Sequence, residues 1–462
     1  MTVSVVIPQA MANDIEAVAS RADETAGVML ASVVNAPNGD TRLLARGMRW
    51  VNDSAYTVRD WNRMSIRSEG YIRALGEAET LRATALWVHT HPGRDAWPVK
   101  SDPDHTVDSE IAELFRIRSG STYYGSLIFS CHSSGLAFTG HLHPEHSKPV
   151  QVSRLWQVGD RWRLYRAFDS PSSQLLPIFD RNVRAFGPAI QQTLSDLKIA
   201  VIGCGGTGSA VAEQLVRLGV RQLLLIDPDI LSASNVTRVY GSTSADIDQP
   251  KGEVLARHLR RIAPELKCDT VQAMVTMESA ARRLTSCDIV FGCTDDNAGR
   301  LVLSRIATYL MTPLIDCGVL LSSDSSGQLR GIDGRVTTIS PGEACLICRN
   351  RINLPRASAE LMTPDERLRL QDEGYAPALA GIEPAVVTFT TLVAATAVSE
   401  LLERLIGYGP QPRPSEVLLR CHEREISTNM AVPRPGHYCH PASSKIGLGI
   451  TEPFLEQTWP TA

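Results

Sequence analysis

Two histidines stand one residue apart in HTHPGRDAWPVKSDPD, residues 89–104, and an aspartate follows 13 residues after the second. On a β-strand, residues i and i+2 point to the same face, so His89 and His91 can converge on one metal ion. Two imidazoles and one carboxylate, here Asp104, suit a catalytic zinc that keeps a fourth position for water. Such a zinc lowers the pKa of the water to about 7, which gives a nucleophile at neutral pH.

A carboxylate base is also needed, because the attacking water must lose a proton. Asp23 and Glu24, which stand just before the apolar run 27–34, are the candidates. The alternative to a metal site is a solvated loop whose histidines are unrelated. The segment therefore predicts either hydrolysis at a zinc centre or no chemistry.

A glycine-rich segment, KIAVIGCGGTGSAVAEQLVRLGV at residues 198–220, combines an apolar run, a glycine turn and a helical pattern. The turn lets the backbone approach a phosphate closely, and the N-terminus of the following helix favours that phosphate. Asp227 ends the next apolar run, where a carboxylate would meet a ribose hydroxyl. These features alone fit a dehydrogenase and an ATP-binding enzyme equally well. The candidate glycines are Gly203, Gly205, Gly206 and Gly208.

The residues beyond this turn favour ATP. Arg238 and Lys251 form a basic pair, and Asp295 ends a further apolar run in GCTDDNAGR. Such a pair offsets the charge of a leaving pyrophosphate, and a strand-end acid positions Mg²⁺, whereas hydride transfer needs neither. The predicted nucleotide-binding set is completed by Asp229, Asn235 and Asn297.

Bulk properties indicate a soluble chain of more than one domain. The 462 residues are 43% hydrophobic and 21% charged, and the net charge of -4 gives no general attraction to nucleic acid or anionic membrane. The N-terminus lacks the pattern of a signal peptide, and no run of 18 uncharged apolar residues predicts a membrane span. Because the ten cysteines are scattered, we expect buried thiols in the cytoplasm.

Two segments with different patterns must position the candidate residues. A Ser/Pro-rich seam predicts a first domain at 1–165, a linker at 166–180 and a second domain at 181–462. The first domain has an α+β pattern, with strands expected at 27–34, 85–91 and 123–130 and helices near 10–22 and 104–118.

The second domain alternates strands and helices, which predicts an α/β fold with a doubly wound, Rossmann-like parallel sheet. Its strands are expected at 198–204, 221–227 and 287–294, and a long buried helix at 385–407.

The pattern HxHP…SxxD resembles the signature of the JAMM/MPN (JAB1-like) metalloproteases, which are zinc deubiquitinases, and Glu24 in ETAGVML is similar to their catalytic glutamate. The resemblance implies a JAMM/MPN domain in which His89, His91 and Asp104 bind zinc. It also implies that Ser101 hydrogen-bonds the developing oxyanion and that Glu24 shuttles the proton. The loop before Ser101 is longer than the family pattern, which leaves its shape open.

The motifs from about residue 180 to 440 resemble, in order, the ThiF/MoeB/ubiquitin-activating family. Members adenylate the C-terminal carboxylate of a ubiquitin-like protein with ATP and Mg²⁺. FDRNVRAFG, residues 179–187, is similar to the family's N-terminal helix, from which a basic residue, here Arg181, reaches the ATP of the partner subunit. The resemblance implies a homodimer, and the alternative for Arg181 and Arg184 is ordinary surface charge.

A second metal site is implied by ACLICRN, which contains Cys345-x-x-Cys348, because many family members hold a structural zinc with two such pairs. Near the C-terminus HYCH offers His437, Cys439 and His440 instead of a second pair. A Cys₃His or Cys₂His₂ zinc site is expected, and buried thiols without zinc are the alternative. The predicted ligands are Cys345, Cys348, Cys439 and His440.

Residues 350–381 contain no cysteine, which excludes the thioester that ubiquitin-activating enzymes form in this segment. The adenylate would pass to a second carrier, or a hydroxyl such as Ser358 or Thr363 would accept it. Cys421 lies in the apolar run VLLRCHE and is predicted to be packed rather than catalytic.

The two resemblances together predict a bifunctional enzyme of a bacterial ubiquitin-like system, some of which are linked to antiviral defence. One module would cut at the C-terminus of a ubiquitin-like protein and the other would adenylate that terminus. A conjugating enzyme would then be a partner. The alternatives are sulfur-carrier processing and activation with a sulfurtransferase as partner, adenylation of a small peptide, and a binding scaffold with both sites inactive.

Overall fold

The computed structural model describes residues 2–93, 97–132, 135–167, 176–324, 328–362 and 385–460. The chain divides into two compact units, Met1–Pro171 with Ile446–Ile450, and Ser172–Lys445 with Thr451–Ala462. The sequence pattern predicts one domain over 181–462, and in the structure Ile446–Ile450 group with the first unit. Within the described ranges, no helix is long and apolar enough to cross a membrane.

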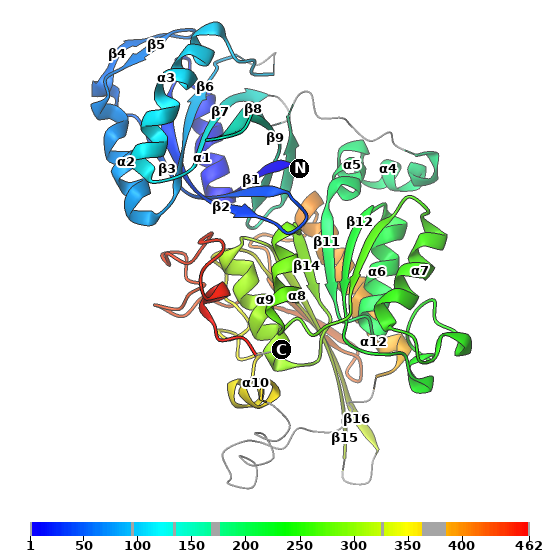
Figure 1. Ribbon diagram of the computed structural model, residues 1–462. Coiled ribbons are helices and arrows are strands. Elements are labelled where there is room, and N and C mark those ends of the chain that lie inside the picture. Colours follow the sequence, from blue (N-terminus) through cyan, green and yellow to red (C-terminus); the bar gives the residue numbers. More distant parts are fainter. Residues whose placement is uncertain are drawn as a thin grey trace. The chain divides into compact units, whose positions relative to one another are not determined.

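The first unit is a β-rich domain with a closed barrel, a feature that the α+β prediction did not contain (Figure 1). Its sheet has the order β1-β3-β2-β6-β7-β8-β9-β10, and parallel pairing of β1 with both β3 and β9 closes it. The strands are β1 (Val3–Pro8), β2 (Ala26–Asn35), β3 (Thr41–Trp50), β6 (Thr84–Thr90), β7 (Tyr123–His132), β8 (Gly135–Pro144), β9 (Val150–Val158) and β10 (Arg163–Arg166). A separate hairpin joins β4 (Tyr56–Arg59) to β5 (Met64–Ile66).

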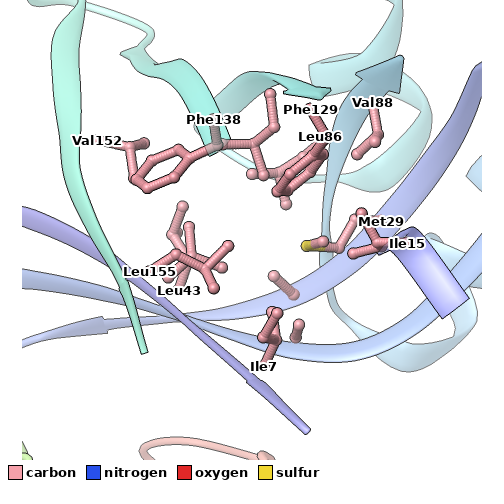
Figure 2. Packing of buried hydrophobic residues seen from close by; sticks show 14 of the residues in the cluster. Ile7, Ile15, Met29, Leu43, Leu86, Val88, Phe129, Phe138, Val152 and Leu155 are labelled. Atoms are coloured by element: carbon pink, nitrogen blue, oxygen red, sulfur yellow. The ribbon is translucent and has the colours of Figure 1, made fainter. Parts of the chain in front are cut away.

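Alternation along the strands gives the first unit two apolar cores. Met29 of β2 and Leu86 of β6 face a core that includes Ile15 of α1 (Gln9–Ala19), as Figure 2 shows. Their neighbours Val28 and Trp87 face the opposite side, where α2 (Glu69–Leu81) and α3 (Asp102–Ser119) pack. Since strand residues alternate in direction, the odd-numbered residues of β6 point toward the side covered by α3.

The second unit contains an eight-stranded sheet in the order β13-β12-β11-β14-β15-β16-β17-β18. The five strands β13, β12, β11, β14 and β15 are parallel, which confirms the predicted Rossmann-like sheet. The strands from β15 to β18 pair antiparallel, which the sequence patterns do not predict. The strand order reverses at β11 and β14, where ligands bind in doubly wound sheets. The strands are β11 (Lys198–Ile202), β12 (Gln222–Ile226), β13 (Lys267–Val271), β14 (Ile289–Gly292), β15 (Leu314–Ser323), β16 (Leu329–Ile339), β17 (Glu416–Arg420) and β18 (Glu425–Asn429).

The long helix predicted at 385–407 is α12 (Val387–Ile406), which packs against α6, β15 and β16 and ends at Gly407 in a left-handed conformation. Its apolar face is buried because Val393, Ala397 and Leu401 follow helical spacing. The other helices are α4 (Asp180–Phe186), α5 (Pro188–Asp196), α6 (Gly206–Leu218), α7 (Lys251–Ile262), α8 (Glu278–Arg283), α9 (Asn297–Tyr309) and α10 (Leu354–Glu360).

Candidate functional sites

Two elements of the first unit bring the predicted metal ligands together. His89 lies near the end of β6, opposite Ala26 of β2 and Ile128 of β7. His91 follows the strand, and its N–H donates to the Phe129 carbonyl at 2.9 Å, so the backbone stays extended. Asp104 stands at the third helical position of α3. The odd-numbered face of β6 and the first turn of α3 therefore meet.

The distances between these ligand atoms fit one zinc ion. His89 Nε2 lies 3.2 Å from His91 Nε2 and 3.1 Å from Asp104 Oδ1, and His91 Nε2 lies 3.6 Å from Asp104 Oδ2. Zinc bonds of about 2.0–2.1 Å at tetrahedral angles place two ligand atoms about 3.3 Å apart. The three side chains could thus hold a zinc ion, and a tetrahedral ion would keep its fourth position for water.

The base candidate beside this group is Glu24, which is buried, whereas Asp23 is exposed. Glu24 Oε1 lies 4.0 Å from His91 Nε2. Burial raises the pKa of Glu24 to about 7, although the neighbouring His89 opposes that shift. Between the two sequence candidates, the geometry favours Glu24.

Ser101 caps α3 and orients the carboxylate ligand. Its hydroxyl and its N–H both donate to Asp104 Oδ2 at 2.7 Å, and its hydroxyl oxygen accepts from the Asp104 N–H at 3.4 Å. These bonds and the contact with His89 hold the pKa of Asp104 well below its usual value, against the effect of burial. Burial and the adjacent His89 lower the pKa of His91 to about 4. Both groups are therefore in the protonation state that a metal requires.

The glycine turn of the second unit is shaped by backbone contacts. Gly203 has a φ of +89°, and a Cβ there would lie 2.7 Å from the Cys293 carbonyl oxygen. A Cβ on Gly208 would overlap the Gly203 carbonyl oxygen, so α6 packs directly on the turn. A Cβ on Gly205 would meet no atom within 4 Å. Because Gly205 is the N-cap of α6, open space lies at the N-terminus of that helix, where its free N–H groups favour a phosphate.

One cavity of about 1060 Å³ in the second unit contains most of the predicted nucleotide-binding set. It lies at the carboxyl ends of β11, β12 and β14 and continues over β15, β16 and β17. Ten predicted residues line it: Gly203, Gly205, Gly206, Asp227, Asp229, Asn235, Arg238, Lys251, Asp295 and Asn297. Gly208 supports the turn from behind. Arg181 is exposed on α4 and does not line this cavity.

Several cavity residues are braced by the protein itself. Asp227 accepts from the N–H groups of Cys204 at 2.5 Å and Asp229 at 2.8 Å, and burial raises the pKa of Asp227. Asn235 Oδ1 accepts from the Ser232 N–H at 3.0 Å, and Asn297 Oδ1 accepts from the Asn353 N–H at 2.8 Å.

The predicted charged groups also differ in whether another part of the protein already binds their side chains. Lys251 Nζ lies 2.7 Å from Asp229 Oδ2, and an Arg238 guanidinium N–H donates to the Ser234 carbonyl at 3.0 Å. Asp295 is exposed and has no hydrogen-bond partner among the described residues, which leaves its carboxylate free for a cation. Its neighbour Asp296 has a structural task, because its side chain caps α9 by accepting from the Gly299 N–H.

The sequence motifs did not point to a group of arginines that also line the cavity. Arg335 donates to Asp316 at 2.9 Å, and Arg351 donates to Glu416 at 2.8 Å. Arg300 lies in GCTDDNAGR, about one turn beyond Asp295, but the sequence motifs predict no role for it or for the other arginines. The further arginines are Arg300, Arg356 and Arg420.

The residues expected to hold a structural zinc lie together, but with a different histidine. The ligand atoms of Cys345, Cys348, His437 and Cys439 lie within 4.8 Å of one another, whereas the Nδ1 of His440, the predicted ligand, accepts from the Ala442 N–H at 3.2 Å. The Sγ atoms of Cys348 and Cys439 are 3.7 Å apart. Zinc–sulfur bonds of about 2.3 Å place two tetrahedral sulfur ligands about 3.8 Å apart. The group fits a structural zinc, with His437 in place of His440.

The candidate acceptors for an adenylate are only partly described. Ser358 is exposed on α10, and Cys421 is half-buried, with its N–H donating to the Ile332 carbonyl at 2.9 Å. Thr363 lies outside the described residues.

The second unit is a doubly wound domain with a glycine turn and a charged cavity at its switch point, the place where such sheets bind ligands. The family model described as "ThiF family" matches residues 179–440, so the chain belongs to the ThiF family.

Three relatives are similar to this region. The sulfur carrier protein ThiS adenylyltransferase of Escherichia coli (strain K12) is 31% identical over 160 residues, which cover 34% of this chain and 60% of that protein. The molybdopterin-synthase adenylyltransferase of the same organism is 30% identical, over 39% of this chain and 70% of that protein. The SAMP-activating enzyme E1 of Haloferax volcanii is 26% identical, over 35% of this chain and 56% of that protein. The chain thus spans 60% of the length of the first of these relatives.

Proposed function

We propose that the second unit adenylates the C-terminal carboxylate of a sulfur-carrier or ubiquitin-like protein, or of a peptide, at the expense of ATP. The main support is the cavity that gathers the glycine turn, Asp227, the basic pair and Asp295. Membership of the ThiF family, whose relatives here include two adenylyltransferases, supports the same activity.

The residues of the cavity suit the two halves of this reaction. A carboxylate oxygen attacks the α-phosphorus, the acyl–phosphate bond forms, and the bond to the β-phosphate breaks to release pyrophosphate. Arg238 and Lys251 offset the charge of the leaving pyrophosphate, the first turn of α6 meets the phosphates, and Asp227 meets the ribose. Mg²⁺ at Asp295 would neutralise further phosphate charge.

The size of the cavity favours an extended tail as the second substrate. Beyond the glycine turn it continues past Val319, Gly334 and Leu419 on three antiparallel strands. A flexible C-terminal tail could lie along this part while its last carboxylate meets the nucleotide. Sulfur-carrier activation is the preferred version, because residues 350–381 contain no cysteine to form a thioester. Ubiquitin-like conjugation, as part of a bacterial defence system, is the other version.

Adenylation is tested by ATP–pyrophosphate exchange in the presence of a small carrier protein that ends in Gly-Gly. We expect exchange with the free C-terminus and none with the same carrier amidated at its C-terminus. Equal exchange with both forms would show that the terminal carboxylate is not the substrate.

We propose further that the first unit, residues 1–165, is a zinc peptidase of the JAMM/MPN type. The supporting observation is the geometry of His89, His91 and Asp104, with Glu24 beside them. Zinc there would activate a water for attack on a carbonyl. Glu24 would accept and return the proton. The N–H of Ser101 would keep holding Asp104, and its hydroxyl would turn from Asp104 to donate to the developing oxyanion.

The peptidase function has a direct assay. A carrier protein with a short extension after Gly-Gly should be cut to the free carboxylate by the zinc-loaded chain and not by the chelated chain. Cleavage that is as fast after chelation would exclude a metallopeptidase. An exposed carboxylate is also what the adenylation cavity requires, which links the two activities on one substrate.

We propose that the active form is a homodimer in which Arg181 serves the cavity of the partner subunit. The exposed position of Arg181 on α4, away from its own cavity, supports this arrangement. Variants Arg181→Ala and Asp295→Ala should each lack exchange activity, and mixing them should restore one intact site per heterodimer. Failure of the mixture to recover activity, despite exchange of subunits, would contradict the proposal.

A further inference from the structure

The helix that provides Asp104 is fixed to the barrel in an unusual way. Among the first nine residues of α3, 102–110, only Asp108 is buried, with 6% of its surface exposed. The buried apolar contacts of this helix begin later, at Ala112 and Phe115. Hydrophobic packing therefore holds the C-terminal half of α3, whereas the first turns depend on a polar contact.

That polar contact is a buried network on the strand β7. Tyr124 Oη donates to Asp108 Oδ1 at 2.6 Å, and Ser126 Oγ donates to Asp108 Oδ2 at 2.9 Å. Lys100 forms an ion pair with Asp108 Oδ2 and donates to Ser126 Oγ at 3.2 Å. The side chains of Lys100 and Asp108 are only 11% and 7% exposed. Hydrogen bonds and a charge partner satisfy the buried carboxylate, which makes the network favourable as a unit.

The network lies close enough to Asp104 along the chain to fix the position of this candidate metal ligand. Asp104 and Asp108 are four residues apart on α3 and share one face of the helix. Lys100 directly precedes Ser101, the cap that donates to Asp104. The network thus fixes the chain on both sides of the junction where the loop becomes helix.

We propose that Asp108, through Lys100, Tyr124 and Ser126, is a positioning residue that holds Asp104 against His89 and His91 and so sets the zinc affinity of the first unit. The inference rests on the proposed zinc site. Asp108→Asn keeps the size of the side chain but removes its charge. The change sets the amide N–H₂ against a hydroxyl and an ammonium that both donate, and it leaves Lys100 unpaired in a buried position.

The test is a zinc titration of the full chain after chelation, read by competition with a chromophoric chelator. Two classes of site are expected, and Asp104→Ala identifies the class that belongs to the first unit. Asp108→Asn should weaken that class about tenfold or more, as loss of supporting contacts does at other metal sites. Affinity of the cysteine class should not change. The matched control is Glu110→Gln, an exposed charge removal on the same helix, which should leave both classes unchanged.

Hydrogen exchange of the metal-free chain provides the second measurement. Amides of residues 104–108 should exchange faster in Asp108→Asn, and those of 112–119 should not. Unchanged zinc affinity in Asp108→Asn would overturn the positioning role alone. Absence of the first-unit class from the parent chain would overturn the zinc site and this inference with it. Faster exchange throughout β2, β6 and β7 would show a global defect and would equally contradict a local role.

Discussion

The two sites of this chain are built in opposite ways. The candidate metal ligands of the first unit come from one strand end and one helix turn, within residues 89–104, and their side chains form the site. The cavity of the second unit draws residues from 202 to 420, and much of its shape comes from the backbone of the glycine turn and the order of the strands. A short sequence motif can therefore describe the first site, whereas the second depends on the whole sheet.

The two sites differ in how many of their side chains are free to bind a ligand and how many hold the protein's own loops in place. In the metal group, His89 and His91 contact each other and Asp104, whereas Asp104 also accepts from Ser101 at the start of α3. In the cavity, Asn235 and Asn297 already use their side-chain oxygens to fix loops, and Asp295 does not. Substitutions of His89 or His91 should change the chemistry alone, whereas substitutions in the cavity should divide into chemical and structural effects.

The largest expected effect is that of His89→Ala on peptide cleavage. Loss of one of three ligands should reduce cleavage at least about 1000-fold, because zinc contributes several kcal/mol to the transition state. ATP–pyrophosphate exchange should keep its rate, since the variant leaves the second unit intact. A parallel fall in both activities would mean that the sites are not independent.

A smaller effect, on stability, should distinguish two glycines of the turn. Gly208→Ala would force a methyl group into the Gly203 carbonyl and should cost about 1 to 3 kcal/mol of unfolding free energy. Gly205→Ala would meet open space, so it should leave stability unchanged and weaken ATP binding. Chemical denaturation and nucleotide titration measure the two quantities. Equal stability of both variants would contradict the contact that α6 makes with the turn.

The smallest effect should come from Asn297→Ala, which removes the acceptor of the Asn353 N–H. One lost hydrogen bond of this kind costs about 1 kcal/mol, and exchange activity should fall less than about tenfold. Denaturation curves and exchange rates of the variant test this bracing role. A loss of activity without any loss of stability would instead make Asn297 a direct nucleotide ligand.

Local patterns predicted the elements that they themselves determine. The strand that carries His89, the helix that carries Asp104 and the strand before Gly203 all follow from periodicity and glycine placement, although α3 begins at Asp102 rather than at the predicted residue 104. Closure of the barrel could not be predicted, because it pairs β1 with β9, about 150 residues away in the chain.

The structural zinc group shows the same limit on a smaller scale. HYCH contains two histidines, one before and one after Cys439. Only the path of the loop decides that His437 and not His440 faces the cysteines. Asp108 was missed for a different reason. Its neighbours Tyr124 and Ser126 lie on a strand that no motif connects with the metal segment.

The central claim, that the cavity of the second unit adenylates a carboxylate, is tested most directly by Asp295→Ala in the ATP–pyrophosphate exchange assay. Because Asp295 is exposed and braces nothing among the described residues, the variant should fold with parent stability. We expect Mg²⁺-dependent exchange to disappear while zinc-dependent cleavage continues. Exchange at the parent rate in Asp295→Ala would contradict the assignment of the site.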